Sequence, residues 1–310
     1  MRRWDNLVEE YTINLTTLGK SPDYVQNTRR ELERWGQWLK RRRPRPKLEQ
    51  VDGDLVIEYI RTRSAFRART TVQAITSKMR CFGDFLVREE VWSSNPLRWI
   101  QGPKLTPYHR MPKRISVSDM QSIWEEAAKE KNDFQRYQWI AILSLLYGTG
   151  LRRGELQRLT LKSWDRETST LFIDGRKTAT ERSVVVPELV HQCIETYLPH
   201  RQNQLSSAQR FSVPSFFLSR TNQPISPSSI SRGVSRLARQ AGFKLHSLHQ
   251  FRHTCASDLL ESGVGMAEVQ QILGHGCLDT TMRYLHIADP QRHDAVAHHP
   301  LNDWLNMEVA

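Results

Sequence analysis

Residues 150–156 read Gly-Leu-Arg-Arg-Gly-Glu-Leu, and the segments around this stretch indicate the fold of the C-terminal two thirds of the chain. Before it, residues 134–147 are rich in large apolar side chains, which is typical of a helix buried in a core. Gly148 and Gly150 permit a sharp turn after that helix. A second helix is therefore expected over residues 153–161, directly behind the turn.

A β-hairpin is expected next, because residues 170–174 and 181–186 alternate in polarity or are β-branched and are followed by Pro187. The remaining segments of this part have helical periodicity, at residues 188–197, 227–241, 250–262, 266–273 and 279–286. The C-terminal part is therefore predicted to be mainly α-helical with one small antiparallel β-sheet.

The first hundred residues are expected to form short amphipathic helices. A first helical pattern stops at Gly19, and Ser21-Pro22 restarts it as an N-cap residue followed by proline in the first turn. Further helices are predicted over residues 54–60 and 70–87. Their apolar stripes favour a core over a partner-binding surface and consist of Leu7, Tyr11, Leu15, Leu18, Leu32, Trp35, Leu39, Val72, Ile75, Met79, Phe82, Phe85 and Leu86.

Prolines and basic residues interrupt regular structure between the two parts. We therefore expect an N-terminal helical domain at residues 1–102 and a basic, proline-containing linker at residues 103–114. A second domain then covers residues 115–290 and opens with a helix N-cap, and residues 291–310 form a C-terminal tail.

The chain is strongly basic, since 45 Lys and Arg against 33 Asp and Glu give a net charge of +12. Residues 29–69 hold 13 basic and 6 acidic side chains, which suits a polyanionic partner. A membrane surface is disfavoured, because prolines and not an apolar helix face follow the basic run at residues 40–43. There is no apolar signal core or spanning segment, and the four cysteines are scattered. We therefore expect a cytoplasmic protein with no membrane association.

Four motifs carry the chemistry. Arg152 lies in the opening stretch, Lys177 lies in the hairpin turn, and residues 249–253 read His-Gln-Phe-Arg-His. Leu273-Gly274-His275 follows, with Tyr284 nine residues after the histidine. This set has no Ser-His-Asp order and no phosphate-cradling glycine loop. It suits a phosphodiester held between positive charges while a phenol oxygen attacks it.

The order and spacing of these motifs resemble the tyrosine recombinase (phage integrase/Xer) family over residues 115–290. The resemblance assigns Arg152 and Arg252 to a phosphate clamp, because guanidinium groups match two non-bridging oxygens. It assigns Tyr284 as the nucleophile and Lys177 as the general acid for the leaving 5′-oxygen.

The resemblance also assigns supporting roles. His249 and His275 are expected to complete the phosphate shell as hydrogen-bond donors or proton shuttles. His253 is expected to be structural, and Phe251 stands where the family usually has Leu. Glu155 is either a carboxylate that orients Arg152 or an ordinary helix-surface residue.

The family resemblance implies a two-domain clamp around double-stranded DNA and a 3′-phosphotyrosyl intermediate. Because the intermediate keeps the bond energy, no cofactor, ATP or metal is expected. Exchange of two duplexes implies a homo-tetramer on DNA, with the tail either on a neighbouring protomer or on its own domain. A sister recombinase or accessory protein is a further possible partner, and the layout favours a simple Xer-like or transposon-borne enzyme.

Three alternative functions fit part of the same residue set. A type IB topoisomerase shares the chemistry, although the H-x-x-R-H and L-G-H boxes favour a recombinase. A non-catalytic DNA-binding protein would tolerate loss of catalytic residues, whereas the set here is complete. A zinc site at His246, His249 and His253 is disfavoured, because Arg252 would place a fixed positive charge beside the cation.

Overall fold

The computed structural model describes residues 4–64, 68–103, 114–174 and 181–274. The chain divides into two compact units, residues 1–109 and 110–310. Most of the expected linker, the predicted helix at 279–286 and the tail at 291–310 lie outside the described residues. Within the described part, no helix is long and apolar enough to cross a membrane.

The first unit is helical, as predicted. Its elements are α1 (Trp4–Thr17), α2 (Pro22–Arg41), a short 3-10 turn (Leu48–Gln50), α3 (Gly53–Ser64) and α4 (Arg69–Arg88). Ser21 caps α2 by accepting a hydrogen bond from the backbone N–H of Tyr24, and Pro22 follows it in the first turn. The predicted stripes meet in one aromatic-rich core around Trp35 and Phe82.

One member of those stripes was predicted wrongly. Leu18 is exposed, because α1 ends at Thr17 and Gly19 then adopts the left-handed conformation with φ +70°. The chain therefore turns away before Leu18 reaches the core.

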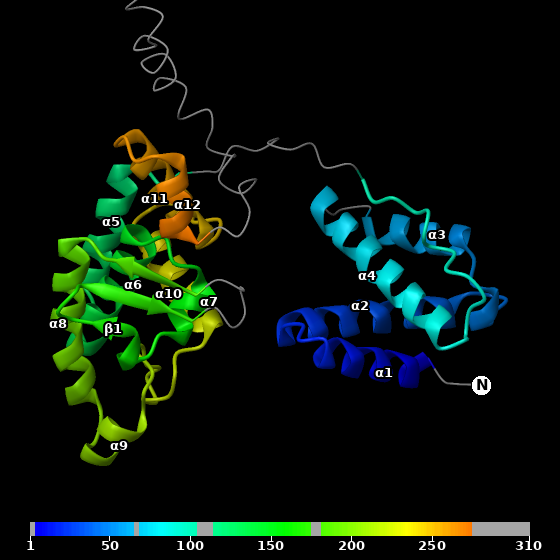
Figure 1. The fold of residues 1–310 in the computed structure, drawn as a ribbon, viewed down its shortest axis with the longest axis horizontal. Helices are drawn as coiled ribbons and strands as arrows, with labels where there is room; N and C mark the ends of the chain where they lie inside the picture. Colours follow the sequence, from blue (N-terminus) through cyan, green and yellow to red (C-terminus); the bar gives the residue numbers. More distant parts are fainter. Residues whose placement is uncertain (1–3, 65–67, 104–113, 175–180, 275–310) are drawn as a thin grey trace, which may run out of the picture. The chain divides into compact units, whose positions relative to one another are not determined.

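The second unit places one small sheet among helices (Figure 1). Its elements are α5 (Val117–Ala128), α6 (Asp133–Gly148), α7 (Arg153–Arg158), a 3-10 turn (Leu161–Ser163), β1 (Trp164–Asp165), β2 (Thr170–Ile173), β3 (Arg182–Val185), α8 (Glu188–Gln204), α9 (Ser207–Ser212), α10 (Pro227–Gln240), α11 (His249–Glu261) and α12 (Met266–Leu273). The three strands are antiparallel in the order β1-β2-β3. The mainly α-helical fold with one small antiparallel sheet is thereby confirmed.

The core of this unit forms around α6, whose residues Ala141, Ile142, Leu143, Leu145 and Leu146 are fully buried. The helix packs closely against α8, and α11 packs against both α6 and α12. Figure 1 shows α11 and α12 side by side, at the end of the unit away from α9. The predicted burial of residues 134–147 is confirmed for the centre of this helix.

Four details of the second unit differ from the prediction, the first of which is strand β1, a third strand beside the expected hairpin. The helix α7 ends at Arg158, before the predicted residue 161, and α9 was not predicted. The helix α8 continues past Pro199 to Gln204. The continuation is anchored by buried Arg201, which donates hydrogen bonds to the backbone carbonyls of Val213, Ser215 and Phe216. Such a tertiary contact overrides the local signal of the proline.

Candidate active site

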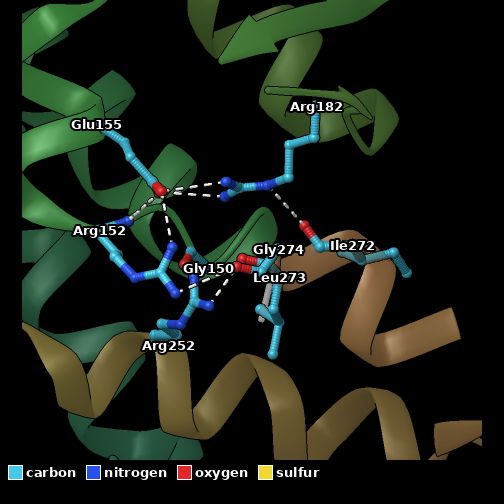
Figure 2. Close-up of polar contacts among 8 residues, drawn as sticks. All are labelled: Gly150, Arg152, Glu155, Arg182, Arg252, Ile272, Leu273 and Gly274. Atoms are coloured by element: carbon cyan, nitrogen blue, oxygen red, sulfur yellow. Dashed lines mark hydrogen bonds and ion pairs between the residues drawn. The ribbon is translucent and has the colours of Figure 1, made fainter. Parts of the chain in front are cut away.

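Four segments that are distant in sequence converge at one place in the second unit. They are the turn before α7 together with the first turn of that helix, the first residue of β3, the N-terminal half of α11 and the C-terminal end of α12 (Figure 2). We call this group the arginine junction, and it consists of Gly150, Arg152, Glu155, Arg182, Arg252, Ile272, Leu273 and Gly274.

The glycine turn brings Arg152 into the junction. Gly150 has φ +60°, a conformation that side chains other than glycine rarely adopt. A Cβ at this position would collide with the side chain of Leu273, so the turn also packs directly on the end of α12. Arg152 then occupies the N-cap position of α7 with an extended backbone.

Glu155 lies at the centre of the junction, with its side chain 1% exposed. One carboxylate oxygen, Oε2, accepts a hydrogen bond from the backbone N–H of Arg152 at 2.8 Å, and Oε1 accepts one from Nη1 of Arg152 at 2.8 Å. The same two oxygens accept hydrogen bonds from Nη2 and Nη1 of Arg182, each at 3.0 Å. Glu155 is therefore a buried partner of Arg152 and not a helix-surface residue.

The two arginines keep Glu155 ionised. Burial alone raises the pKa of this carboxyl, but the hydrogen bonds and charge of Arg182, together with the hydrogen bonds of Arg152, bring the pKa down to about 2. The carboxylate is thus negatively charged at neutral pH and holds both guanidinium groups in fixed positions.

Arg252, on α11, is buried and lies beside the same turn. Its Nη1 donates to the carbonyl of Gly150 and its Nη2 donates to the carbonyl of Leu273, both at 2.7 Å. His249 is the first residue of α11 and is exposed, whereas His253, one turn further on, is half-buried. Although His249 keeps contact with water, partial desolvation, followed by the charges of Arg252 and Arg152, lowers its pKa and favours its neutral form.

Three consecutive carbonyls at the end of α12 each accept a hydrogen bond from a different arginine. Nε of Arg182 donates to Ile272 O at 3.2 Å, Nη2 of Arg252 to Leu273 O at 2.7 Å, and Nη2 of Arg152 to Gly274 O at 3.2 Å. The last carbonyls of a helix have no partner within the helix and carry its negative dipole end. Guanidinium groups are therefore well suited to anchor this helix terminus.

Arg182 was not identified from the sequence. Its side chain is 8% exposed, and the strand pairing places it opposite Ile173, next to the hairpin turn. The sequence does indicate the inward direction of this side chain. Successive residues of a strand point to opposite faces, and Arg182, Val184 and Val186 alternate with the exposed residues Ser183 and Val185. That alternation puts Arg182 on the same inward face as two core valines.

The site residues that were predicted from the sequence are only partly within the described structure. The structure brings Arg152, Glu155 and Arg252 together, with His249 near enough for the charges of Arg252 and Arg152 to contribute to the lowering of its pKa. Arg153, the residue after Arg152, is not part of the junction and donates a hydrogen bond to Ser231 of α10. Three others, Lys177, His275 and Tyr284, lie outside the described residues, and the structural role of half-buried His253 stays a prediction.

The chemistry available at the junction is the binding of an anion. Two guanidinium groups pair with the one carboxylate and a third, that of Arg252, lies against the same turn, so the junction has an excess of positive charge. Arg152 is the most accessible of the ion-paired groups, with its side chain 28% exposed. Within the described ranges, no group of three or more His, Cys, Asp or Glu side chains is placed to hold a metal ion.

Comparison with known proteins finds relatives over most of the chain. The phage integrase family matches residues 111–291. The tyrosine recombinase XerD of Halalkalibacterium halodurans is 28% identical over 289 residues, which cover 91% of this chain and 93% of that protein. The tyrosine recombinase XerC of Listeria monocytogenes serotype 4b is 31% identical over 236 residues, which cover 75% of this chain and 77% of that protein.

A solved structure confirms the likeness of the fold. The XerH site-specific recombinase bound to its palindromic difH substrate superposes with a TM-score of 0.72 and 16% identity. The superposition covers 88% of this chain and 79% of XerH.

Proposed function

The chain belongs to the phage integrase family of tyrosine recombinases, and we propose that it cuts and rejoins duplex DNA at specific sites through a 3′-phosphotyrosyl intermediate. The observation that carries the proposal is the arginine junction, in which Arg152 and Arg252 converge from different helices and Glu155 fixes the position of Arg152. Such a pair of fixed guanidinium groups stabilises the charge that builds up on the non-bridging oxygens in the transition state.

The proposed first step is the attack of the Tyr284 oxygen on the scissile phosphorus. A bond forms between this oxygen and phosphorus, the bond from phosphorus to the 5′-oxygen breaks, and Lys177 gives a proton to the leaving oxygen. His249, whose pKa is lowered, is neutral near pH 7 and suited to accept or relay the phenol proton. His275 completes the phosphate shell.

The proposed second step reverses the first on a different strand. A 5′-hydroxyl from the partner duplex attacks the phosphotyrosyl phosphorus and releases Tyr284. The number of phosphodiester bonds is unchanged, so the reaction needs neither ATP nor a metal.

The proposed assembly is a clamp of two domains on double-stranded DNA, acting in the cytoplasm at the nucleoid. Residues 1–102 supply DNA binding, residues 115–290 supply catalysis, and the tail at 291–310 contacts a neighbouring protomer. Exchange of two duplexes uses four active sites, so a homo-tetramer is proposed, with a sister recombinase or accessory protein as a further partner. The binding of duplex DNA in this proposal is supported by the similar fold of XerH, which was solved on its palindromic difH substrate.

A covalent-capture experiment tests the proposed function. The wild-type protein is mixed in EDTA with fragmented genomic DNA from its source, and denatured protein–DNA adducts are recovered and sequenced at their ends. Adducts clustered at one inverted repeat are expected. Adducts without sequence preference would indicate a type IB topoisomerase, and DNA binding without adducts would indicate a non-catalytic DNA-binding protein.

A further inference from the structure

Arg182 joins three parts of the proposed active site at once. It begins β3, it makes a two-pronged ion pair with Glu155 of α7, and its Nε donates to the carbonyl of Ile272 in α12 (Figure 2). Its side chain is 8% exposed against 28% for Arg152. The guanidinium of Arg152 is therefore accessible to a ligand, whereas that of Arg182 is nearly buried and contacts Glu155 and α12 instead.

The charge of Glu155 is divided between the two arginines. Its Oε1 accepts from Nη1 of Arg152 at 2.8 Å and from Nη1 of Arg182 at 3.0 Å. Because Arg182 neutralises the carboxylate, much of the positive charge of Arg152 stays available for an outside anion. Without Arg182, the buried carboxylate would pair with Arg152 alone and cancel that charge.

The backbone of Gly274 lies directly against Arg182. A Cβ added to Gly274 would come within 2.6 Å of Nη1 and 2.7 Å of Cδ of Arg182, and Gly274 has φ +64°. Arg182 therefore limits where the chain leaves α12, one residue before His275. In sequence it also follows Lys177 by five positions, at the base of the same hairpin.

We propose that Arg182 is a positioning residue of the recombinase, which leaves the positive charge of Arg152 available to the scissile phosphate, holds Arg152 in place through Glu155 and fixes the end of α12 beside it. This inference rests on the proposed function. Arg182 does not touch DNA in this account, and its effect reaches the phosphate through Arg152.

The test compares two chemical forms of the scissile phosphate. One substrate is a duplex with the DNA site captured by the wild-type protein, nicked so that the cleaved strand diffuses away and the adduct accumulates. The other carries a methylphosphonate at the scissile position, in which a methyl group replaces one charged non-bridging oxygen. The methylphosphonate carries less charge, so its cleavage depends less on the charge of Arg152.

The variant Arg182→Met is expected to form adduct about 100-fold more slowly on the ordinary phosphate, because misplacement of a binding group by about 1 Å has an effect of this size. On the methylphosphonate, the wild-type and variant rates are expected to differ by less than about 10-fold. The affinity for the intact duplex is expected to change little, since binding is spread over many phosphate contacts.

A matched control separates this role from simple stabilisation of the fold. Arg236 of α10 forms an ion pair with Glu130 in the same unit, outside the arginine junction. The variant Arg236→Met is expected to lower the melting temperature. Any slowing of adduct formation by this variant should be equally large on the ordinary phosphate and on the methylphosphonate. If Arg182→Met does not fold, Arg182→Lys replaces it, since lysine keeps the charge but cannot pair with both oxygens of Glu155 as the guanidinium does. Arg182→Lys is expected to form adduct about 10-fold more slowly than wild type on the ordinary phosphate, and at the wild-type rate on the methylphosphonate.

An equal defect of Arg182→Met on both substrates would overturn the inference, because a loss of folded protein slows both reactions alike. A wild-type rate on the ordinary phosphate would overturn it as well. Neither result bears on the proposed function, which is tested separately by whether the wild-type protein forms adducts, at which DNA sequence and through which residue.

Discussion

Replacing Glu155 with Gln removes the charge at the centre of the arginine junction and keeps the size of the side chain. The pKa of Glu155 is about 2 in the folded protein against an ordinary value of 4.5. A difference of this size corresponds to about 3 kcal/mol of unfolding free energy at pH 7. We therefore expect Glu155→Gln to be less stable than wild type by about 3 kcal/mol at neutral pH.

The sign of the pH dependence follows from the lowered pKa. The stabilisation by the ionised carboxylate is complete above the unfolded-state pKa of 4.5 and is lost as the pH falls through the folded-state value of about 2. Glutamine resembles the protonated form of Glu155. The difference in unfolding free energy between the two proteins should therefore shrink to about half of its neutral value near pH 3.

The assay is urea-induced unfolding followed by circular dichroism at pH 7 and pH 3. Because the chain has two compact units, the transition that shifts in the variant identifies the second unit. A difference below about 1 kcal/mol at pH 7 would refute the strong pairing. A difference of equal size at both pH values would show that the charge of Glu155 is not its cause.

Three further predictions concern other parts of the site. Gly274→Ala is expected to lower the unfolding free energy, measured by urea unfolding, by about 1–2 kcal/mol because of its left-handed backbone, and by more because the new Cβ collides with Arg182. Unchanged stability and cleavage would contradict the close packing of Gly274 against Arg182. Lys177→Ala should abolish cleavage of an ordinary phosphodiester but cleave a substrate with sulfur in place of the 5′-oxygen, since a thiolate leaves without a proton; no rescue in a gel-based cleavage assay would argue against the general-acid role. DNA affinity should fall linearly with salt on a double-logarithmic plot, and a flat plot would rule out binding through phosphate contacts.

Much of the fold could be predicted because its signals are local. Apolar spacing located the helices, Ser21-Pro22 marked the start of α2, and alternation marked the hairpin strands. The extension of α8 past Pro199 depends on buried Arg201, a tertiary contact that no local pattern contains. The exposure of Leu18 similarly depends on where α1 ends.

The site was predicted in part for the same reason. Arg152, Glu155 and Arg252 lie in recognisable motifs, and the structure places them in one junction. Arg182 belongs to none of the four motifs, and its role depends on a contact with Ile272, 90 positions away in sequence. Alternation in β3 indicated which way Arg182 points but could not identify its partners.

The most direct test of the central claim is to identify the residue that is joined to DNA. Adducts formed by the wild-type protein are digested with nuclease and trypsin, and the peptides are analysed by mass spectrometry. Cleavage after Arg283 leaves a peptide of residues 284–292, which begins with Tyr284. A nucleotide linked through its 3′-phosphate to Tyr284 is expected, and no adduct is expected from Tyr284→Phe, which should still bind DNA. A nucleotide on any other residue, or adducts that persist in Tyr284→Phe, would contradict the central claim.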